Sequence, residues 1–275
     1  MAEAKDPTAL LRWYVAMGVD EAIDETPQDR LAAPSPPLPA RPPAINLAAA
    51  AARTARPPVI EPQNGAAAAH ALAAATASLQ ELEAAVASFE GCALRRTATH
   101  TVFADGTPHA PVMVIGEAPG ADEDRIGKPF VGRSGQLLDR MLAAIGLERQ
   151  RNVYITNMLF WRPPGNRKPT DDEIAACLPF VWRHIALNRP EVVVLCGGTA
   201  TSAMLGRAEG ITRLRGKWFD LAVEGLDRPV PALTTYHPSF LLRSPARKSE
   251  SWHDFLELQS KLESIEKNSN KNPPD

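Results

Sequence analysis

From residue 112 onward, short apolar runs rich in β-branched residues alternate with stretches of helical spacing. Apolar runs that break at turn residues are typical of buried strands. Their alternation with helices predicts a parallel sheet covered by helices on both faces. We therefore expect an α/β fold, a three-layer αβα sandwich with a central four-stranded parallel sheet. The strands are predicted at 112–115, 153–156, 192–195 and 230–235, and the helices at 134–146, 171–188, 198–206 and 246–265.

The chain on either side of this region has a different character. Residues 8–25 carry apolar side chains at helical spacing and predict a short amphipathic helix within an N-terminal segment, 1–32. Residues 33–65 are rich in proline and alanine, which indicates a semi-extended, mobile linker. The main domain is expected at 66–265 and begins with an alanine-rich helix, whereas the polar tail at 266–275 is expected to be disordered.

Charge and cysteine content limit which binding partners and which cellular compartment we expect. The net charge is −2, but residues 1–32 hold seven acids and three bases, so they contribute −4 and the remainder carries +2. A near-neutral domain can still bind nucleic acid where its bases gather on one face. Three cysteines do not make a disulfide framework, and no apolar run is long enough to span a bilayer. We expect a cytoplasmic protein with no membrane partner.

The loops that follow the predicted strands hold most of the candidate chemistry. Residues 116–135, GEAPGADEDRIGKPFVGRSG, follow the first strand. Asn157 and WRPPGNRKP follow the second, and Tyr236-His237-Pro238-Ser239 follows the fourth. Parallel strands bring such loops to one edge of the sheet, where ligands of open α/β folds bind. Carboxylates, amides, an aromatic ring and a histidine are therefore expected to meet there.

This set of side chains suits a pocket for a planar base. Asparagine presents a donor and an acceptor side by side, an aromatic face stacks on a ring, and histidine can donate to a carbonyl oxygen. A single asparagine or histidine at a strand end is more often structural. Three such loops in succession favour a pocket.

The loop motifs resemble those of a known family. GEAPGADEDRIGKPFVGRSGQLLDRML, then N-x4-RPPGNRKP and YHPSFLLR, are similar to the motifs of family 4 uracil-DNA glycosylases, bacterial and archaeal members of the uracil-DNA glycosylase superfamily. The resemblance runs from about Cys92 to Phe255 and includes GITRLRGKWF at 210–219. It implies a four-stranded parallel sheet between helices, in agreement with the strand pattern.

The resemblance also implies roles for individual residues. Phe130 would stack on a flipped-out uracil, Asn157 would read its amide edge, and His237 would contact O2 and stabilise the departing uracil anion. Glu117 stands where the family keeps an essential acid, and Glu123 with Asn166 resembles a second polar pair near the attacked sugar. Which carboxylate orients the water is left open. So is selectivity against thymine, because EAPGA lacks the tyrosine that excludes it elsewhere in the superfamily.

DNA contacts are expected around this pocket. Residues 240–243, FLLR, match the family's element that wedges into the duplex. Basic residues in three loops beside the pocket motifs predict a rim that binds phosphates, with affinity that falls steeply with salt. The candidate DNA-binding residues are Arg162, Arg167, Arg213, Arg215, Leu241, Leu242 and Arg243.

The cysteines depart from the family pattern. Family 4 enzymes usually bind a [4Fe–4S] cluster through four cysteines, of which this chain keeps Cys92 and Cys177. The other two positions fall on Phe89 and Trp161, which offer no lone pair to iron. We therefore expect no metal and no cofactor, with aromatic packing in the place of the cluster. Cys196 is expected to be a buried apolar residue.

The expected function is a monofunctional uracil-DNA glycosylase of base excision repair, a monomer associated with the bacterial nucleoid. It would flip uracil from double- or single-stranded DNA, release free uracil and leave an abasic site. No lysine is placed as a Schiff-base nucleophile, so no strand cleavage is expected. The alternative is a non-catalytic or product-retaining binder of uracil-containing or abasic DNA. A nucleotide hydrolase is disfavoured because GxxxxGK[ST] is absent. Whether residues 1–32 bind a protein partner is left open.

Overall fold

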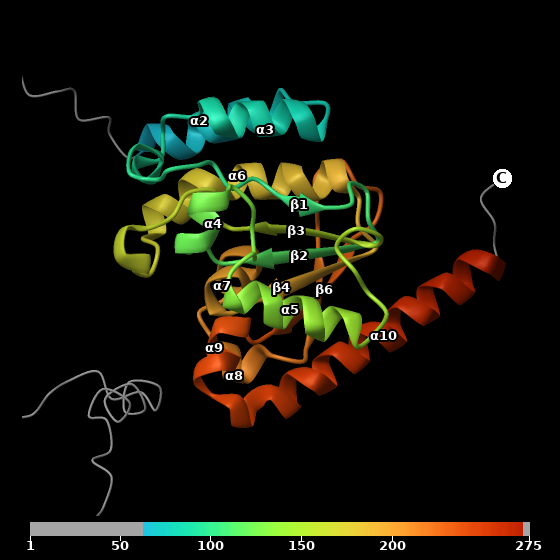
Figure 1. Cartoon of the computed structure of the whole chain (residues 1–275). Helices are drawn as coiled ribbons and strands as arrows, with labels where there is room; N and C mark the ends of the chain where they lie inside the picture. The colour runs from blue at the N-terminus through green and yellow to red at the C-terminus, as the bar shows by residue number, and fades with distance from the viewer. Residues whose placement is uncertain (1–62, 272–275) are drawn as a thin grey trace, which may run out of the picture. The chain divides into compact units, whose positions relative to one another are not determined.

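The computed structural model describes residues 63–271 (Figure 1). The predicted helix at 8–25, the segment 1–32 and the linker up to residue 62 lie outside the described residues. The last linker positions are helical, because helix α2 begins at Gln63 (Gln63–Ala74). The C-terminal helix α10 (Lys248–Lys271) continues six residues past 265, into the part of the tail that was expected to be disordered.

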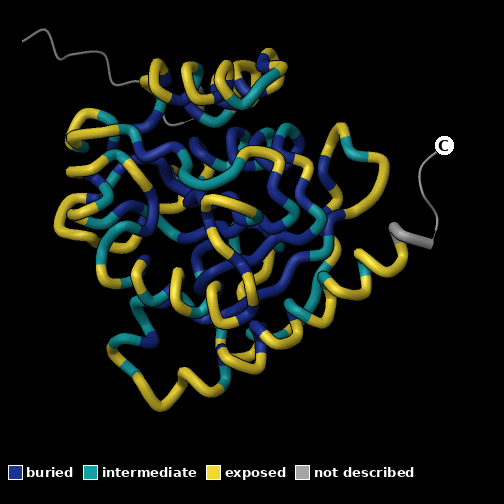
Figure 2. Tube along the Cα trace, turned by 45° about the vertical axis from the view of Figure 1, so that its right-hand side comes forward, coloured by how far each residue is buried: buried dark blue, intermediate teal, exposed yellow. Residues whose placement is uncertain are grey.

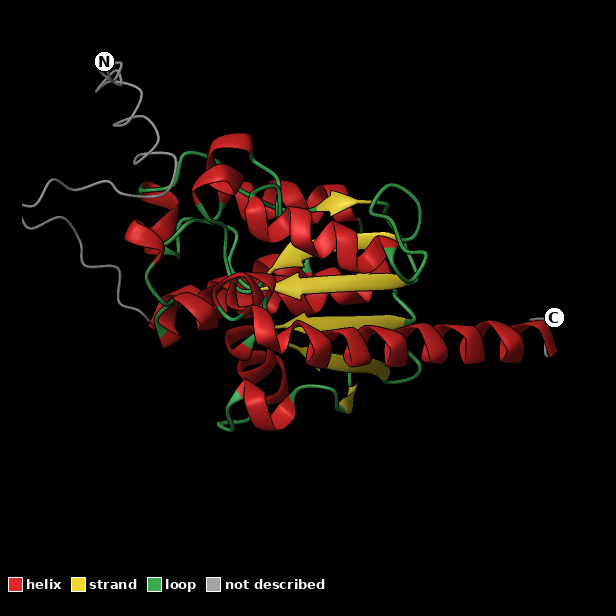
Figure 3. Cartoon of the chain, turned by 60° about the horizontal axis from the view of Figure 1, so that its bottom comes forward, coloured by secondary structure: helices red, strands yellow, loops and turns green. Residues whose placement is uncertain are grey.

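The sheet has six strands, two more than expected, in the order β1-β3-β2-β4-β6-β5. The four central strands are parallel, as predicted, and Figure 3 shows their arrows pointing the same way. The two edge strands, β1 and β5, pair antiparallel to this core. In chain order the strands are β1 (Asp105–Gly106), β2 (Val112–Gly116), β3 (Val153–Asn157), β4 (Val192–Cys196), β5 (Trp218–Leu221) and β6 (Val230–Thr235).

Alternate residues of the central strands face opposite layers of helices, which gives the predicted αβα sandwich. In β2, Met113 and Ile115 belong to one core cluster with residues of α6 (Asp171–Asn188). Val112 and Val114 belong to a second cluster with residues of α5 (Arg133–Ala143) and α10. Because both faces are covered, every residue of β2, β3 and β4 is buried, which explains their continuous apolar runs (Figure 2).

Two further helices, α2 and α3 (Leu79–Ser88), lie on the outer side of α6 (Figure 1). Helix α6 begins at a capping box, in which the Thr170 hydroxyl accepts from the Glu173 N–H and the Glu173 carboxylate accepts from the Thr170 N–H. None of the helices within 63–271 is both long and apolar enough to cross a membrane.

The remaining helices are short and lie in the segments before, between and after the strands. Most of them follow the carboxyl ends of the parallel strands and therefore surround one edge of the sheet (Figure 3). They are η1 (Ala93–Arg96), α4 (Ala121–Ile126), η2 (Pro164–Asn166), α7 (Gly198–Leu205), α8 (Ile211–Leu214), α9 (Pro238–Arg243) and η3 (Pro245–Arg247).

Candidate active site

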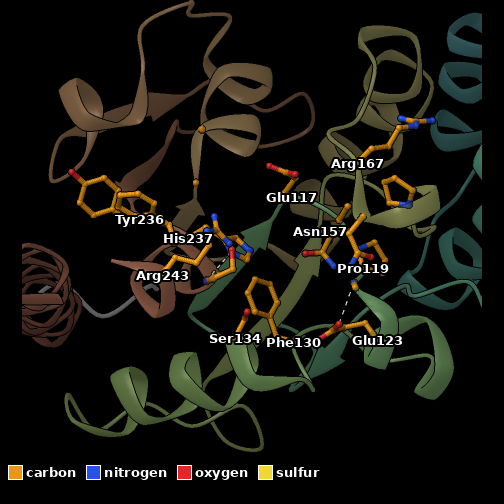
Figure 4. A pocket seen from close by; sticks show the side chains of 18 of the residues that line it. Glu117, Pro119, Glu123, Phe130, Ser134, Asn157, Arg167, Tyr236, His237 and Arg243 are labelled. Atoms are coloured by element: carbon orange, nitrogen blue, oxygen red, sulfur yellow. Dashed lines mark hydrogen bonds between the residues drawn. The ribbon is translucent and has the colours of Figure 1, made fainter. Parts of the chain in front are cut away.

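A cavity of about 490 Å³ opens at the carboxyl ends of the parallel strands. Its walls come from the loops after β2, β3, β4 and β6, so the structure brings the predicted strand-end motifs together. Figure 4 shows Glu117, Phe130, Asn157 and His237 around this space. The register places Gly116 beside Asn157, which lines the cavity.

Phe130 forms one wall, and its backbone is unusual. Its φ is 53°, in the left-handed region, which costs an ordinary side chain about 1–2 kcal/mol. The ring stacks on the His237 imidazole, with centroids 5.4 Å apart and planes 30° from parallel. A Cβ on Gly116 would collide with both the Phe130 ring and the Asn157 side-chain oxygen. Glycine at 116 therefore allows ring, amide and strand to converge.

Asn157 ends β3 and is almost completely buried. Its side-chain oxygen, Oδ1, accepts no hydrogen bond from any described residue. A buried acceptor without a donor costs about 1–3 kcal/mol, so this oxygen is a ready partner for a ligand N–H. The cavity is the place from which such a donor would come.

His237 is the N-cap of α9, and its ring is held in one tautomer. The backbone N–H of Ser239 donates to Nδ1 at 3.2 Å, and the Ser239 hydroxyl lies 2.8 Å from the same nitrogen. Because Nδ1 accepts, the neutral ring carries its proton on Nε2. Burial, with a smaller effect of the Arg243 charge, lowers the pKa of His237 to about 4. The ring is therefore a neutral donor at physiological pH.

His237 also depends on the glycine that it packs against. Gly197 has a φ of 94°, and a Cβ there would lie 3.0 Å from the His237 Cβ. Glycine adopts this conformation freely, whereas a side chain would be strained and crowded.

Glu117 follows β2 and lines the cavity (Figure 4). The hydroxyl of Thr199, in the first turn of α7, donates to Glu117 Oε2 at 2.6 Å. Sequence analysis did not identify Thr199, because its partner lies 82 positions away and no local pattern links them. Its position directly after the glycines that follow β4 is the only sequence signal.

Glu123 is bound by the backbone on both oxygens. One oxygen accepts from the N–H groups of Val131 and Gly132 at 3.0 and 2.9 Å, and the other accepts from Gly120 N–H at 3.1 Å. Glu123 therefore ties the start of α4 to the turn that carries Phe130. Asn166, the residue predicted to pair with it, lines the same cavity but accepts from Arg162 Nε at 2.7 Å. Among the described residues no hydrogen bond joins Glu123 to Asn166.

The predicted DNA-binding residues differ in their exposure and in whether the protein already pairs their charge. Arg243 and Arg213 are exposed, and Arg243 lines the cavity together with Arg167. Arg167 is paired with Glu173 through two contacts of 2.6 and 2.8 Å. Arg215 binds the buried Asp254, so its charge is compensated within the protein. The two leucines of the predicted duplex wedge also differ in exposure: Leu241 is fully buried, whereas Leu242 is partly exposed.

The four residues compared above with cluster ligands, Phe89, Cys92, Trp161 and Cys177, all belong to one core cluster. Phe89 and Trp161 are both buried, and the ring of Phe89 contacts Phe180 edge-on with centroids 5.1 Å apart. The Trp161 ring N–H donates to the Thr101 hydroxyl at 3.0 Å. Cys92 and Cys177 are buried free thiols. Cys196 is fully buried, as expected.

The chain is similar to a family of known proteins over most of the residues that the structure describes. The family model of the uracil DNA glycosylase superfamily matches residues 103–257. The type-4 uracil-DNA glycosylase of Archaeoglobus fulgidus is 38% identical over 185 residues, which cover 66% of this chain and 92% of that protein. The enzyme of the same name from Thermotoga maritima is 40% identical over 154 residues, 56% of this chain and 77% of that protein. The chain belongs to the uracil DNA glycosylase superfamily.

Proposed function

We propose that this chain excises uracil from DNA as a monofunctional glycosylase and leaves an abasic site. The observation that carries the proposal is the buried Asn157 side-chain oxygen, which has no donor among residues 63–271 and lies in one cavity with a stacking ring and a neutral histidine donor. Uracil presents an N–H between two carbonyl groups and therefore matches this arrangement. The type-4 uracil-DNA glycosylases similar to this chain support the same substrate.

Base binding follows from the cavity walls. A base inside a duplex cannot reach these groups, so the nucleotide must first flip out, which costs a few kcal/mol and less for a mispaired uracil. Phe130 then stacks on the flipped ring. The Asn157 oxygen accepts from uracil N3–H, and its amide nitrogen donates to the neighbouring carbonyl. Pairing Asn157 relieves the desolvation cost that it carries when the cavity is empty.

Cleavage of the N-glycosidic bond places negative charge on the uracil and positive charge on the sugar. The Nε2–H of His237 is oriented to donate to uracil O2, where negative charge grows. One donor of this kind contributes about 10²–10³-fold to the rate in other enzymes. His237 need not transfer a proton, because its lowered pKa keeps it a neutral donor throughout.

Of the two candidate acids, we propose that Glu117 orients the water that attacks the sugar. Glu123 already accepts three backbone N–H groups, which occupy both of its oxygens. Glu117 has one oxygen bound by Thr199 and a second for which no protein donor is found among the described residues, so it can accept from a water. The same carboxylate favours the positive charge on the sugar.

We also propose that the chain works without an iron–sulfur cluster. Such a cluster takes four thiolates, whereas the corresponding set here is Phe89, Cys92, Trp161 and Cys177. The two aromatic rings have no lone pair for iron, and Trp161 uses its only polar hydrogen on Thr101. Edge-on ring contacts of Phe180 with Phe89 and with Phe160 support the view that hydrophobic packing fills this region instead. Packing of fully buried side chains contributes about 1.5–3 kcal/mol each.

An alkali-cleavage assay tests the proposal. End-labelled oligonucleotides with one uracil, single-stranded and opposite guanine, are incubated with the full chain, treated with alkali and separated on a gel. We expect cleavage at the uracil after alkali and none before it, since no lysine is placed to cut the strand. Binding of the same DNA without alkali-labile product would instead support a non-catalytic binder. A strand cut without alkali would contradict the monofunctional assignment.

A further inference from the structure

Arg149 is buried on the backbone side of Phe130, in the loop between α5 and β3, with 7% of its surface exposed. All five of its N–H groups have acceptors. Two donate to backbone carbonyls, one to Phe130 at 2.8 Å and one to Pro129 at 3.2 Å. The other three donate to the carboxylates of Asp105 and Asp139 at 2.8–3.0 Å.

The two carboxylates fix the orientation of the guanidinium. Asp105 comes from the edge strand β1 and Asp139 from α5. The planar set of guanidinium donors, here called the fork, is therefore held from two separate elements. Burial alone lowers the pKa of an arginine, but the hydrogen bonds that Arg149 donates to Asp105 and Asp139, together with their negative charges, outweigh it and raise the pKa of Arg149. Arg149 is therefore a permanently charged and rigid donor. A planar fork of this kind cannot be reproduced by lysine.

The turn that Arg149 contacts has a conformation which needs support. Phe130 has a positive φ of 53°, a state that persists only where the surroundings determine it. Glu123 binds the N–H groups of Val131 and Gly132 on one side of the turn. Arg149 binds the carbonyls of Pro129 and Phe130 on the other. The direction of the Phe130 ring into the cavity follows from this pair of contacts (Figure 4).

We propose that Arg149 is a positioning residue for base excision, which holds the left-handed turn that presents the Phe130 ring to the flipped base. The inference rests on the proposed function, and Arg149 itself does not line the cavity. Without the fork the turn relaxes, and the ring moves away from Gly116 and His237. A displacement of about 1 Å at a reacting site can lower a rate by about 10²-fold.

The test compares Arg149→Lys with Arg183→Lys in the full chain. Lysine keeps the charge and loses the fork. Arg183 is a matched control because it also donates to a backbone carbonyl through two nitrogens, that of Thr76, and does not line the cavity. We expect Arg149→Lys to lower the single-turnover excision rate by about 10- to 100-fold and to weaken inhibition by free uracil. Affinity for duplex DNA without uracil should change less than about twofold, and Arg183→Lys should excise at the wild-type rate.

A double-mutant cycle with Phe130→Ala separates positioning from general stabilisation. If Arg149 acts through the ring, its substitution changes the rate little once the ring is gone. An equal loss in both backgrounds, or an unchanged rate in Arg149→Lys, overturns the inference. Should Arg149→Lys not fold, Asp139→Asn takes its place in the cycle, because that carboxylate is 47% exposed and its loss only loosens the fork. A wild-type chain that excises no uracil overturns the proposed function, and the inference falls with it.

Discussion

The Thr199 hydroxyl donates to Glu117 Oε2 at 2.6 Å and thereby joins the ends of two neighbouring parallel strands. Glu117 follows β2, and Thr199 opens α7 after β4. The bond fixes one oxygen of the carboxylate, and no protein donor binds the other among residues 63–271. A short hydrogen bond to a charged group contributes more than one between neutral groups, about 1.5–3 kcal/mol.

Removal of this hydroxyl is expected to lower activity through Glu117. Thr199→Val keeps the shape and loses the donor, so the excision rate should fall about tenfold or more, while Thr199→Ser should retain most of it. Single-turnover kinetics measure both. Thr201→Val is the matched control, because Thr201 is buried on the same helix and its hydroxyl has no partner among the described residues. Equal rates in Thr199→Val and wild type would contradict the role assigned to Glu117.

The rate of excision should not follow the ordinary titration of histidine. The pKa of His237 lies at about 4, below its usual 6.5, so the ring stays neutral as the pH falls from 8 to about 5. It takes up a second proton only near pH 4, where the Ser239 N–H loses its acceptor. Single-turnover rates measured across this range should show no step near 6.5 that depends on His237. A step there that disappears in His237→Gln would contradict a neutral donor.

Asn157 should govern affinity for the base more than affinity for DNA. Asn157→Ala removes both polar groups that face the cavity, and we expect excision to fall by about 10²-fold or more. Inhibition by free uracil should weaken in parallel, whereas binding of undamaged duplex should persist. Asn152→Ala is the control, because Asn152 lies just before the opposite end of the same strand and bonds to the turn at Gly146 and Glu148. Similar losses in both variants would count against base recognition by Asn157.

Metal analysis tests the proposed absence of a cluster. Protein purified without oxygen should contain far less than one iron and one acid-labile sulfide per chain and show no visible charge-transfer band. The double variant Phe89→Cys with Trp161→Cys restores four cysteines and serves as the positive control for reconstitution. About four irons per wild-type chain, with matching sulfide, would refute the proposal.

The sequence predicted the elements whose burial leaves a pattern. The four parallel strands are covered on both faces, so continuous β-branched runs such as 112–115 and 192–195 revealed them. The edge strands left no such signal, since β1 has two residues and β5 is mostly half-exposed. Edge pairing depends on a neighbouring strand rather than on local periodicity, and the expected four-stranded sheet was therefore too small.

The candidate site was predictable to the same extent. Phe130, Asn157 and His237 sit in loops that parallel topology must bring together, and the structure places them in one cavity. Thr199 and Arg149 could not be found, because each acts on a partner chosen by tertiary packing. Arg149 looks in the sequence like one more basic residue of a polar turn, LERQRN. Only its own burial, its two carboxylate partners and the left-handed turn distinguish it.

Direct detection of released uracil tests the central claim most closely. The wild-type chain is incubated in excess with a duplex that holds one U·G pair, and free base and alkali-labile sites are both quantified. The account predicts one released uracil for each abasic site. It also predicts that folded His237→Ala and Asn157→Ala variants produce neither. Tight binding of the uracil-containing duplex without release of uracil would contradict it.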